Sequence, residues 1–250
     1  MGSMMTRHPT GVARRSATTP SVTSASLKVA MAVSGSVLMA FVFVHMVGNL
    51  KVFLGRDELN HYAAFLREFG VPLMPHGWFL WIVRVLLTVC VVTHMASAAV
   101  LTSRARAAGR NRTTRGHQVS WWRSFTSRTM AVSGVVITAF VGFHLLDLTL
   151  GVAAADGFRH PATVDGATAY FAYENLVGSF QRPAAAALYV LAMLVLGAHL
   201  SHGSWSVIHD LGVTGARARR TALIVLSVVA AAVVVGNVSI PLAVQAGWVS

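Results

Sequence analysis

The sequence predicts an all-α membrane protein with five transmembrane helices. The chain has 250 residues, of which 55% are hydrophobic and 11% are charged, whereas a soluble domain carries about 25% charged residues. Eight acidic side chains cannot solvate so apolar a surface, so lipid must be much of the solvent. Five stretches reach the roughly 20 apolar residues that a span needs: Leu27 to Leu50, Trp78 to Ser103, Met130 to Val152, Pro183 to Ile208 and Thr221 to Val244.

The basic residues indicate the orientation of these spans. Residues 1–26 are polar and basic, so we expect a cytoplasmic tail followed by a five-helix domain over residues 27–250. Lys and Arg cluster in the tail, in the loop 104–128 and around Arg217, which places the N-terminus in the cytoplasm and the C-terminus outside. The net charge of +12 does not indicate nucleic-acid binding, because the basic residues lie in short stretches between apolar runs.

The predicted outer loop after the first span contains a helical pattern. Leu59, Tyr62, Leu66 and Phe69 recur at helical spacing, and charged residues fill the other side. The loop therefore contains a short amphipathic helix that we expect to lie on the outer membrane surface.

An internal repeat relates the first and third spans. Residues 31–45 read MAVSGSVLMAFVFVH and residues 130–144 read MAVSGVVITAFVGFH, with ten of fifteen positions identical at an offset of 99 residues. The second and fourth spans follow in equivalent places, each with a histidine deep inside. We therefore predict a four-helix core made from a duplicated two-helix unit, to which the fifth span is added.

Four histidines lie inside spans, where an ionisable side chain is costly and a functional role is the default. His45 lies about 25 Å beyond Lys28 at helical rise, and His144 lies at a similar distance beyond Arg128. His94 and His199, on spans that run inward, each lie about 15 Å from the inner edge. Depth therefore predicts an outer pair, His45 with His144, and an inner pair, His94 with His199.

Two pairs of imidazoles at two depths fit two b-type haems, because each haem iron takes one axial nitrogen from each side of the ring. Gly35 and Gly134 lie near the inner level, where small residues let a haem pass the helices that do not ligate it. Arg84 lies near the outer level, where a haem propionate would pair with it. Lys51 and Arg182 are further propionate candidates nearer the outer surface.

The competing interpretations fit less well. Zinc requires ligands that converge on one point, and a covalent c-type haem requires CxxCH, whereas the sequence has one cysteine. A proton-coupled transporter without haem usually pairs its histidines with acids, and Asp147 is the only acid near a span interior. This transporter remains an alternative, as does a di-haem cytochrome b of a hydrogenase or formate dehydrogenase.

Two motifs carry a family resemblance. The run from His45 through Gly48 and Asn49 to Phe53, with Asn60 and Tyr62 beyond it, resembles the first-span motif of the di-haem cytochrome b anchor of bacterial succinate dehydrogenases. The run HLSHGSWS over residues 199–206, which leads on to Leu211 and Gly212, resembles the fourth-span motif of this family. The related fumarate reductases share the architecture.

The resemblance implies a non-catalytic electron-transfer subunit in a bacterial inner membrane. Such a subunit binds a flavoprotein subunit and an iron–sulfur subunit on its cytoplasmic face and passes electrons from succinate to menaquinone. The resemblance also implies that His199, and not His202, is the ligand on the fourth span. His209 departs from the family pattern, where relatives often have glutamine, and its role stays open.

Overall fold

The computed structural model describes residues 22–109, 121–154, 156–164 and 166–250. The predicted tail, residues 1–26, therefore lies mostly outside the described residues, and the basic loop 104–128 lies partly outside them. The first helix begins at Ser24, three residues before the predicted span. The side chain of Thr23 fixes this start, because its hydroxyl oxygen accepts a hydrogen bond of 3.1 Å from the backbone N–H of Ser26.

Five helices in the described part of the chain are long and apolar enough to cross a bilayer, which confirms the predicted spans. Many of their large apolar side chains are exposed, for example Val135 at 69% and Leu191 at 61%. Such exposure is expected where lipid covers the surface. The helices are α1 (Ser24–Asn49), α3 (Trp78–Gly109), α4 (Trp121–His144), α6 (Pro183–Asp210) and α7 (Ala216–Gln245).

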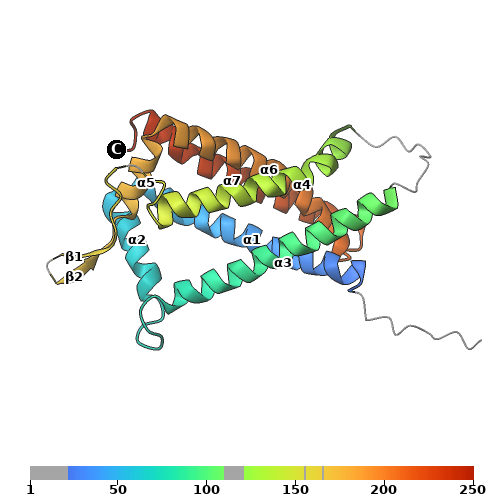
Figure 1. The fold of residues 1–250 in the computed structure, drawn as a ribbon, viewed down its shortest axis with the longest axis horizontal. Coiled ribbons are helices and arrows are strands. Elements are labelled where there is room, and N and C mark those ends of the chain that lie inside the picture. The colour runs from blue at the N-terminus through green and yellow to red at the C-terminus, as the bar shows by residue number, and fades with distance from the viewer. Residues whose placement is uncertain (1–21, 110–120, 155, 165) are drawn as a thin grey trace, which may run out of the picture.

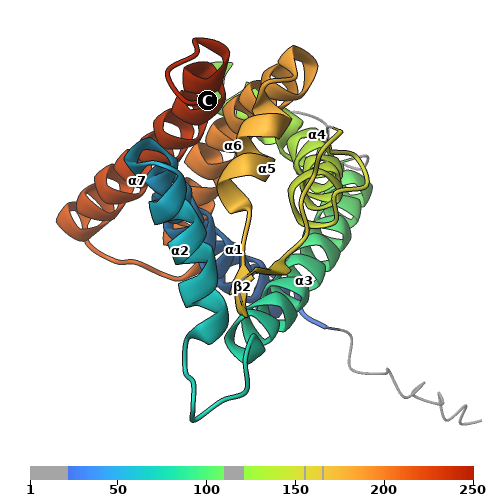
Figure 2. The same ribbon diagram turned by 90° about the vertical axis from the view of Figure 1, so that its left-hand side faces the viewer.

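The five helices form one bundle in which successive spans run in opposite directions (Figure 1). Helix α1 packs against α3, α6 and α7, and α4 packs against α6. Figure 2 shows α1 behind α2, with α7 on one side and α3 on the other. The four helices that carry the predicted histidines thus pack into one core, and α7 packs on its α1 and α6 side.

The shorter elements gather at the end of the bundle that also holds the C-terminus (Figure 1). Helix α2 (Arg56–Glu68) is the predicted amphipathic helix, with Leu59 buried and Phe69 exposed just after its end. Helix α5 (Ala172–Phe180) and the antiparallel strands β1 (Ala162–Val164) and β2 (Ala167–Ala169) were not predicted. Buried residues of α2, α5, α6 and α7 form a hydrophobic cluster here, so this end is the best packed part of the described chain.

The two copies of the repeat end differently just beyond their histidines. After Asn49 the chain tightens into a 3₁₀ turn, η1 (Leu50–Leu54). After His144 it widens into a π turn, η2 (Leu145–Thr149), where the N–H of Leu150 donates to the carbonyl of Leu145 at 2.9 Å. A π turn within an α-helix often marks a functional position.

Candidate functional site

The structure brings the four predicted histidines together in the two predicted pairs. His45 of α1 and His144, the last residue of α4, have their ring centroids 5.9 Å apart. His94 of α3 and His199 of α6 have theirs 6.3 Å apart. Each pair joins two helices that are far apart in sequence. The two histidines predicted at each depth therefore lie together in space.

The inner pair is fixed by the two copies of the repeated sequence. Nδ1 of His94 lies 3.0 Å from the backbone carbonyl oxygen of Met31 and 3.5 Å from Oγ of Ser34. Nδ1 of His199 lies 3.0 Å from Oγ of Ser133. Ser34 and Ser133 are equivalent at the 99-residue offset of the repeat. The first copy, on α1, therefore orients His94 on α3. The second copy, on α4, orients His199 on α6.

The outer pair is fixed in another way. The ring of His45 stacks on Phe41, with centroids 5.4 Å apart and an interplanar angle of 19°. Nδ1 of His144 lies 3.3 Å from the phenol oxygen of Tyr189, and this phenol also bonds to Oδ2 of Asp147 at 3.1 Å. Asp147 and Tyr189 are both buried. Their presence distinguishes the surroundings of His144 from those of the inner histidines.

The hydrogen bonds of three histidines favour the proton on Nδ1. The carbonyl of Met31 has no hydrogen to give, so Nδ1 of His94 must be the donor. Ser133 donates its one hydrogen to the carbonyl of Met130, and the phenol of Tyr189 donates to Asp147. With both hydroxyl hydrogens used in this way, Nδ1 of His199 and of His144 act as donors to the hydroxyl oxygens. In all three rings Nε2 keeps a free lone pair, which is the form that binds a metal.

The spacing of each pair fits one metal ion between two imidazoles. Metal–imidazole bonds of about 2.0–2.1 Å on both sides keep the ring centroids roughly 6 Å apart. Among the described residues, no three His, Cys, Asp or Glu side chains gather closely enough to hold a metal ion. The histidines thus come as separate pairs with two nitrogens each. Haem iron has this requirement, because the porphyrin supplies its other four ligands.

Gly35 and Gly134 lie beside the inner histidines. A Cβ atom on Gly35 would lie 2.9 Å from Cε1 of His94, which is too close for an ordinary contact. A Cβ atom on Gly134 would lie 4.0 Å from Cε1 of His199, at normal contact distance. Only Gly35 is therefore needed to make room for the histidine ring, and the proposal that both glycines make room for a haem stays a prediction.

The three predicted propionate partners have different surroundings. Lys51 forms an ion pair of 3.4 Å with Glu58. Arg182 pairs with buried Asp147 and also donates to the carbonyl of Ala153 at 2.9 Å. The guanidinium group of Arg84 lies 5.1 Å from the ring centroid of Trp81. Propionate binding by these residues stays a prediction, and Arg84 is the one that is not paired with an acid among the described residues.

A second cation lies near Arg84. The guanidinium group of Arg67, on α2, lies 4.4 Å from the ring centroid of Tyr170. Burial lowers the pKa of Arg67, the tyrosinate charge of Tyr170 would raise it, and the positive charge of Arg84 lowers it further. Arg67 and Arg84 thus place two positive charges near each other at the start of α3.

Two further histidines of α6 lie beyond His199. His202 lies one turn farther along the helix, and His209 is exposed near its end. Nδ1 of His209 donates to the carbonyl of Trp205 at 2.7 Å, and the two rings lie 4.1 Å apart. Neither histidine belongs to one of the two close pairs. This arrangement agrees with His199 as the ligand, which stays a prediction.

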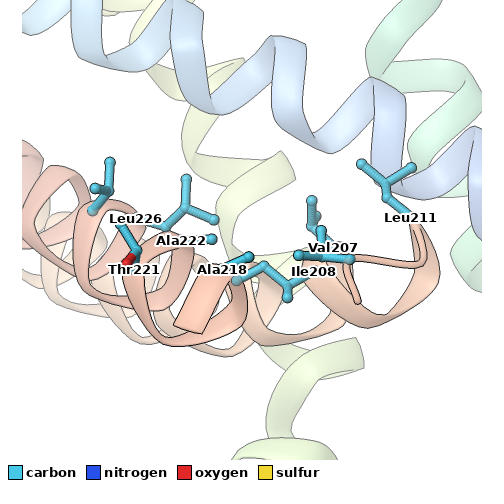
Figure 3. A pocket seen from close by; sticks show the side chains of 9 residues that line it. Val207, Ile208, Leu211, Ala218, Thr221, Ala222 and Leu226 are labelled. Atoms are coloured by element: carbon cyan, nitrogen blue, oxygen red, sulfur yellow. The ribbon is translucent and has the colours of Figure 1, made fainter. Parts of the chain in front are cut away.

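An open apolar groove of about 590 Å³ lies where α6 and α7 meet at the opposite end of the bundle from α2 and α5 (Figure 3). Thr221 contributes the only polar side chain to its lining. The groove therefore lacks groups for acid–base or redox chemistry, and the histidine pairs are the candidate functional site. The lining residues are Val207, Ile208, Leu211, Val213, Ala218, Thr221, Ala222, Val225 and Leu226.

Sequence comparison gives one family. The sequence model of the family described as "Succinate dehydrogenase/Fumarate reductase transmembrane subunit" matches residues 102–236, more than half of the chain. The match includes His144 and His199, one ligand candidate from each pair. No curated protein matches the chain, and no solved structure matches it.

Proposed function

The chain belongs to the succinate dehydrogenase/fumarate reductase transmembrane subunit family, and we propose that it is a di-haem cytochrome b anchor of such an enzyme. In this proposal it carries electrons between an iron–sulfur subunit and menaquinone in the membrane. Membership of this family argues against the cytochromes of hydrogenases and formate dehydrogenases, which the sequence alone left open. Catalysis on succinate or fumarate belongs to the partner subunits.

The observation that carries the proposal is the shared hydrogen-bond geometry of three partly buried imidazoles. His94, His144 and His199 each have a hydrogen-bond partner at Nδ1, which leaves Nε2 for a metal, and the ring centroids of the two pairs lie 5.9 and 6.3 Å apart. Fixing the second nitrogen in this way orients a metal-bound histidine and raises its basicity. A haem-free transporter would give no reason for three histidines to share one tautomer at metal-binding spacing.

The protein has three tasks in this mechanism. The haems supply one-electron chemistry, while the paired histidines hold each iron and set its potential. Electrons from the iron–sulfur subunit would enter beside His94 and His199 and continue toward His45 and His144. Arg84, Lys51 and Arg182 would stabilise the propionates. The apolar walls of the bundle exclude water, so the potentials depend on the few polar groups near each pair.

The partners and the location follow from the same proposal. The flavoprotein and iron–sulfur subunits would bind on the cytoplasmic side, at the end of the bundle opposite α2 and α5. The chain would lie in a bacterial inner membrane, with its N-terminus in the cytoplasm and its C-terminus outside. Lipid would cover the exposed apolar side chains of the five spans.

The test is to purify the tagged chain from membranes of its source cells and record a reduced-minus-oxidised absorbance spectrum. We expect a b-type band from two haems per chain, a flavin-bearing partner, and reduction of the band by succinate. A nickel- or molybdenum-bearing partner would contradict the assignment to this enzyme. A chain that contains no b-type haem would refute the cytochrome and favour a transporter.

A further inference from the structure

Beside His144, a buried polar cluster lies between α4 and α6. Asp147, in the π turn η2, has no solvent-exposed surface. It accepts hydrogen bonds from Oγ of Ser179 at 2.5 Å and from the phenol of Tyr189 at 3.1 Å, and it pairs with Arg182. The carboxyl oxygens of Asp147 thus act as acceptors for one arginine and two hydroxyl groups.

The cluster reaches His144 through one phenol. The single hydrogen of Tyr189 goes to Asp147, which leaves the phenol oxygen to accept from Nδ1 of His144 at 3.3 Å. A phenol that donates to a carboxylate is a stronger acceptor, because hydrogen bonds in a chain polarise one another. The carboxylate charge is thus transmitted to the imidazole without direct contact between Asp147 and His144.

The first copy of the repeat lacks this arrangement. The residue equivalent to Asp147 at the 99-residue offset is Gly48. A Cβ atom on Gly48 would lie 2.6 Å from Cε1 of Tyr62, so the glycine is required for packing against α2. The inner histidines donate to neutral acceptors, the carbonyl of Met31 and the hydroxyl of Ser133. Among these four sites, only that of His144 is linked to a buried carboxylate.

We propose that Tyr189 and Asp147 are positioning residues that orient His144 and lower the reduction potential of the outer haem relative to the inner one. The inference rests on the proposed function. A stronger acceptor on Nδ1 makes the imidazole a better electron donor to iron, which favours the oxidised form. Neutral acceptors at the inner pair give a weaker effect.

Packing alone is the simpler explanation for Tyr189, and one substitution separates the two. The ring of Tyr189 contacts the rings of Phe140, Phe143 and Phe180 in the hydrophobic cluster. Tyr189→Phe keeps these contacts and removes only the hydroxyl group. Tyr173→Phe is a matched control, because Tyr173 lies in the same cluster and donates to the backbone carbonyl of Ser250 at 3.1 Å, away from the histidines.

The experiment is a redox titration of the purified complex with electron paramagnetic resonance of its ferric haems. The component that disappears in His45→Ala identifies the outer haem. In Tyr189→Phe we expect the equilibrium constant for reduction of this component to rise about three- to tenfold, the size of one hydrogen bond. Its g-values should change, the other component should stay as in the wild type, and Tyr173→Phe should alter neither.

Ser179→Ala should shift the potential of the outer haem in the opposite direction. It tests the proposal even if the Tyr189→Phe complex does not assemble. Loss of the serine donor leaves Asp147 a stronger acceptor for Tyr189, so reduction of the outer component should become less favourable. A change in the inner component, a change in both, or no change in a two-haem complex would overturn the proposal. A wild-type complex without b-type haem would overturn the proposed function itself, whatever the variants show.

Discussion

At the inner pair, His94 and His199 donate to acceptors on the helix that precedes each of them in the chain. At the outer pair, Nδ1 of His144 bonds to Tyr189 on α6, the next transmembrane helix, and His45 stacks on Phe41 of its own helix. The two copies of the repeat thus make similar contacts at the inner pair and different contacts at the outer pair. Near the inner pair, the equivalent positions of the two copies both hold serine, Ser34 and Ser133. Near the outer pair, one pair of equivalent positions differs, with Gly48 in the first copy and Asp147 in the second. Symmetry in sequence therefore predicts symmetry in the surroundings of the inner pair only.

The largest expected effect distinguishes the two inner-end histidines of α6. His199→Ala should remove the inner haem, because an iron with one remaining imidazole loses its second axial ligand. His202→Ala, one turn away, should keep both haems. Haem content per chain, measured by absorbance, checks this. Loss of a haem in His202→Ala with retention in His199→Ala would reverse the assignment.

The two repeated serines should differ in importance. Ser133→Ala removes the acceptor of His199, and loss of such a partner typically costs about 10- to 100-fold in affinity. Ser34→Ala should cost much less, because His94 keeps the carbonyl of Met31 at 3.0 Å. Haem retention during dilution of the purified complex measures both. Equal losses would show that the Met31 carbonyl does not orient His94.

The two repeated glycines should also differ. In Gly35→Ala the new Cβ atom must displace the ring of His94, so the absorbance and g-values of the inner haem should change. In Gly134→Ala the new atom makes an ordinary contact, so both haems should resemble those of the wild type. If Gly134→Ala proves the more damaging, haem contact rather than the histidine ring determines the need for glycine.

The smallest effect concerns the predicted propionate partners. Arg84→Gln should lower the potential of the outer haem, because a nearby cation favours the added electron, by no more than about 59 mV, a tenfold change for one electron. Lys51→Gln should have less effect, since Lys51 is already neutralised by Glu58. The redox titration of the outer component checks both. If Arg84→Gln instead shifts the reduction potential of the inner component, Arg84 lies near the inner haem and the prediction is wrong.

The spans, α2 and the pairing of the four histidines could be predicted from the sequence. Span length and the number of residues from each basic end fix the height of a residue along a helix, and height was enough to pair the histidines. The family motifs also predicted that His199, and not His202, is the ligand on the fourth span. These features depend on distances along one helix axis, which the sequence records directly.

The groups that orient the histidines could not be predicted in the same way. Contacts such as Ser133 with His199 depend on how each helix is rotated about its axis, and nearly uniform apolarity leaves this rotation undetermined. The π turn at Leu145–Thr149 has no distinct residue pattern, so the contact of Asp147 with Tyr189 was not foreseen. The sequence predicts Arg182 as a propionate partner but does not reveal its pairing with Asp147. The Ser-Gly pair repeated at residues 34–35 and 133–134 was the one sequence feature that indicated the groups around the inner pair.

The pairing itself can be tested most directly with four variants and one redox titration. The variants are His45→Ala, His144→Ala, His94→Ala and His199→Ala. We predict that the first two leave the same single haem, with one midpoint potential, and that the last two leave the other haem. Two results would contradict the assignment of one haem to each histidine pair. One is that His45→Ala and His94→Ala leave the same haem, and the other is that each of the four variants keeps both haems.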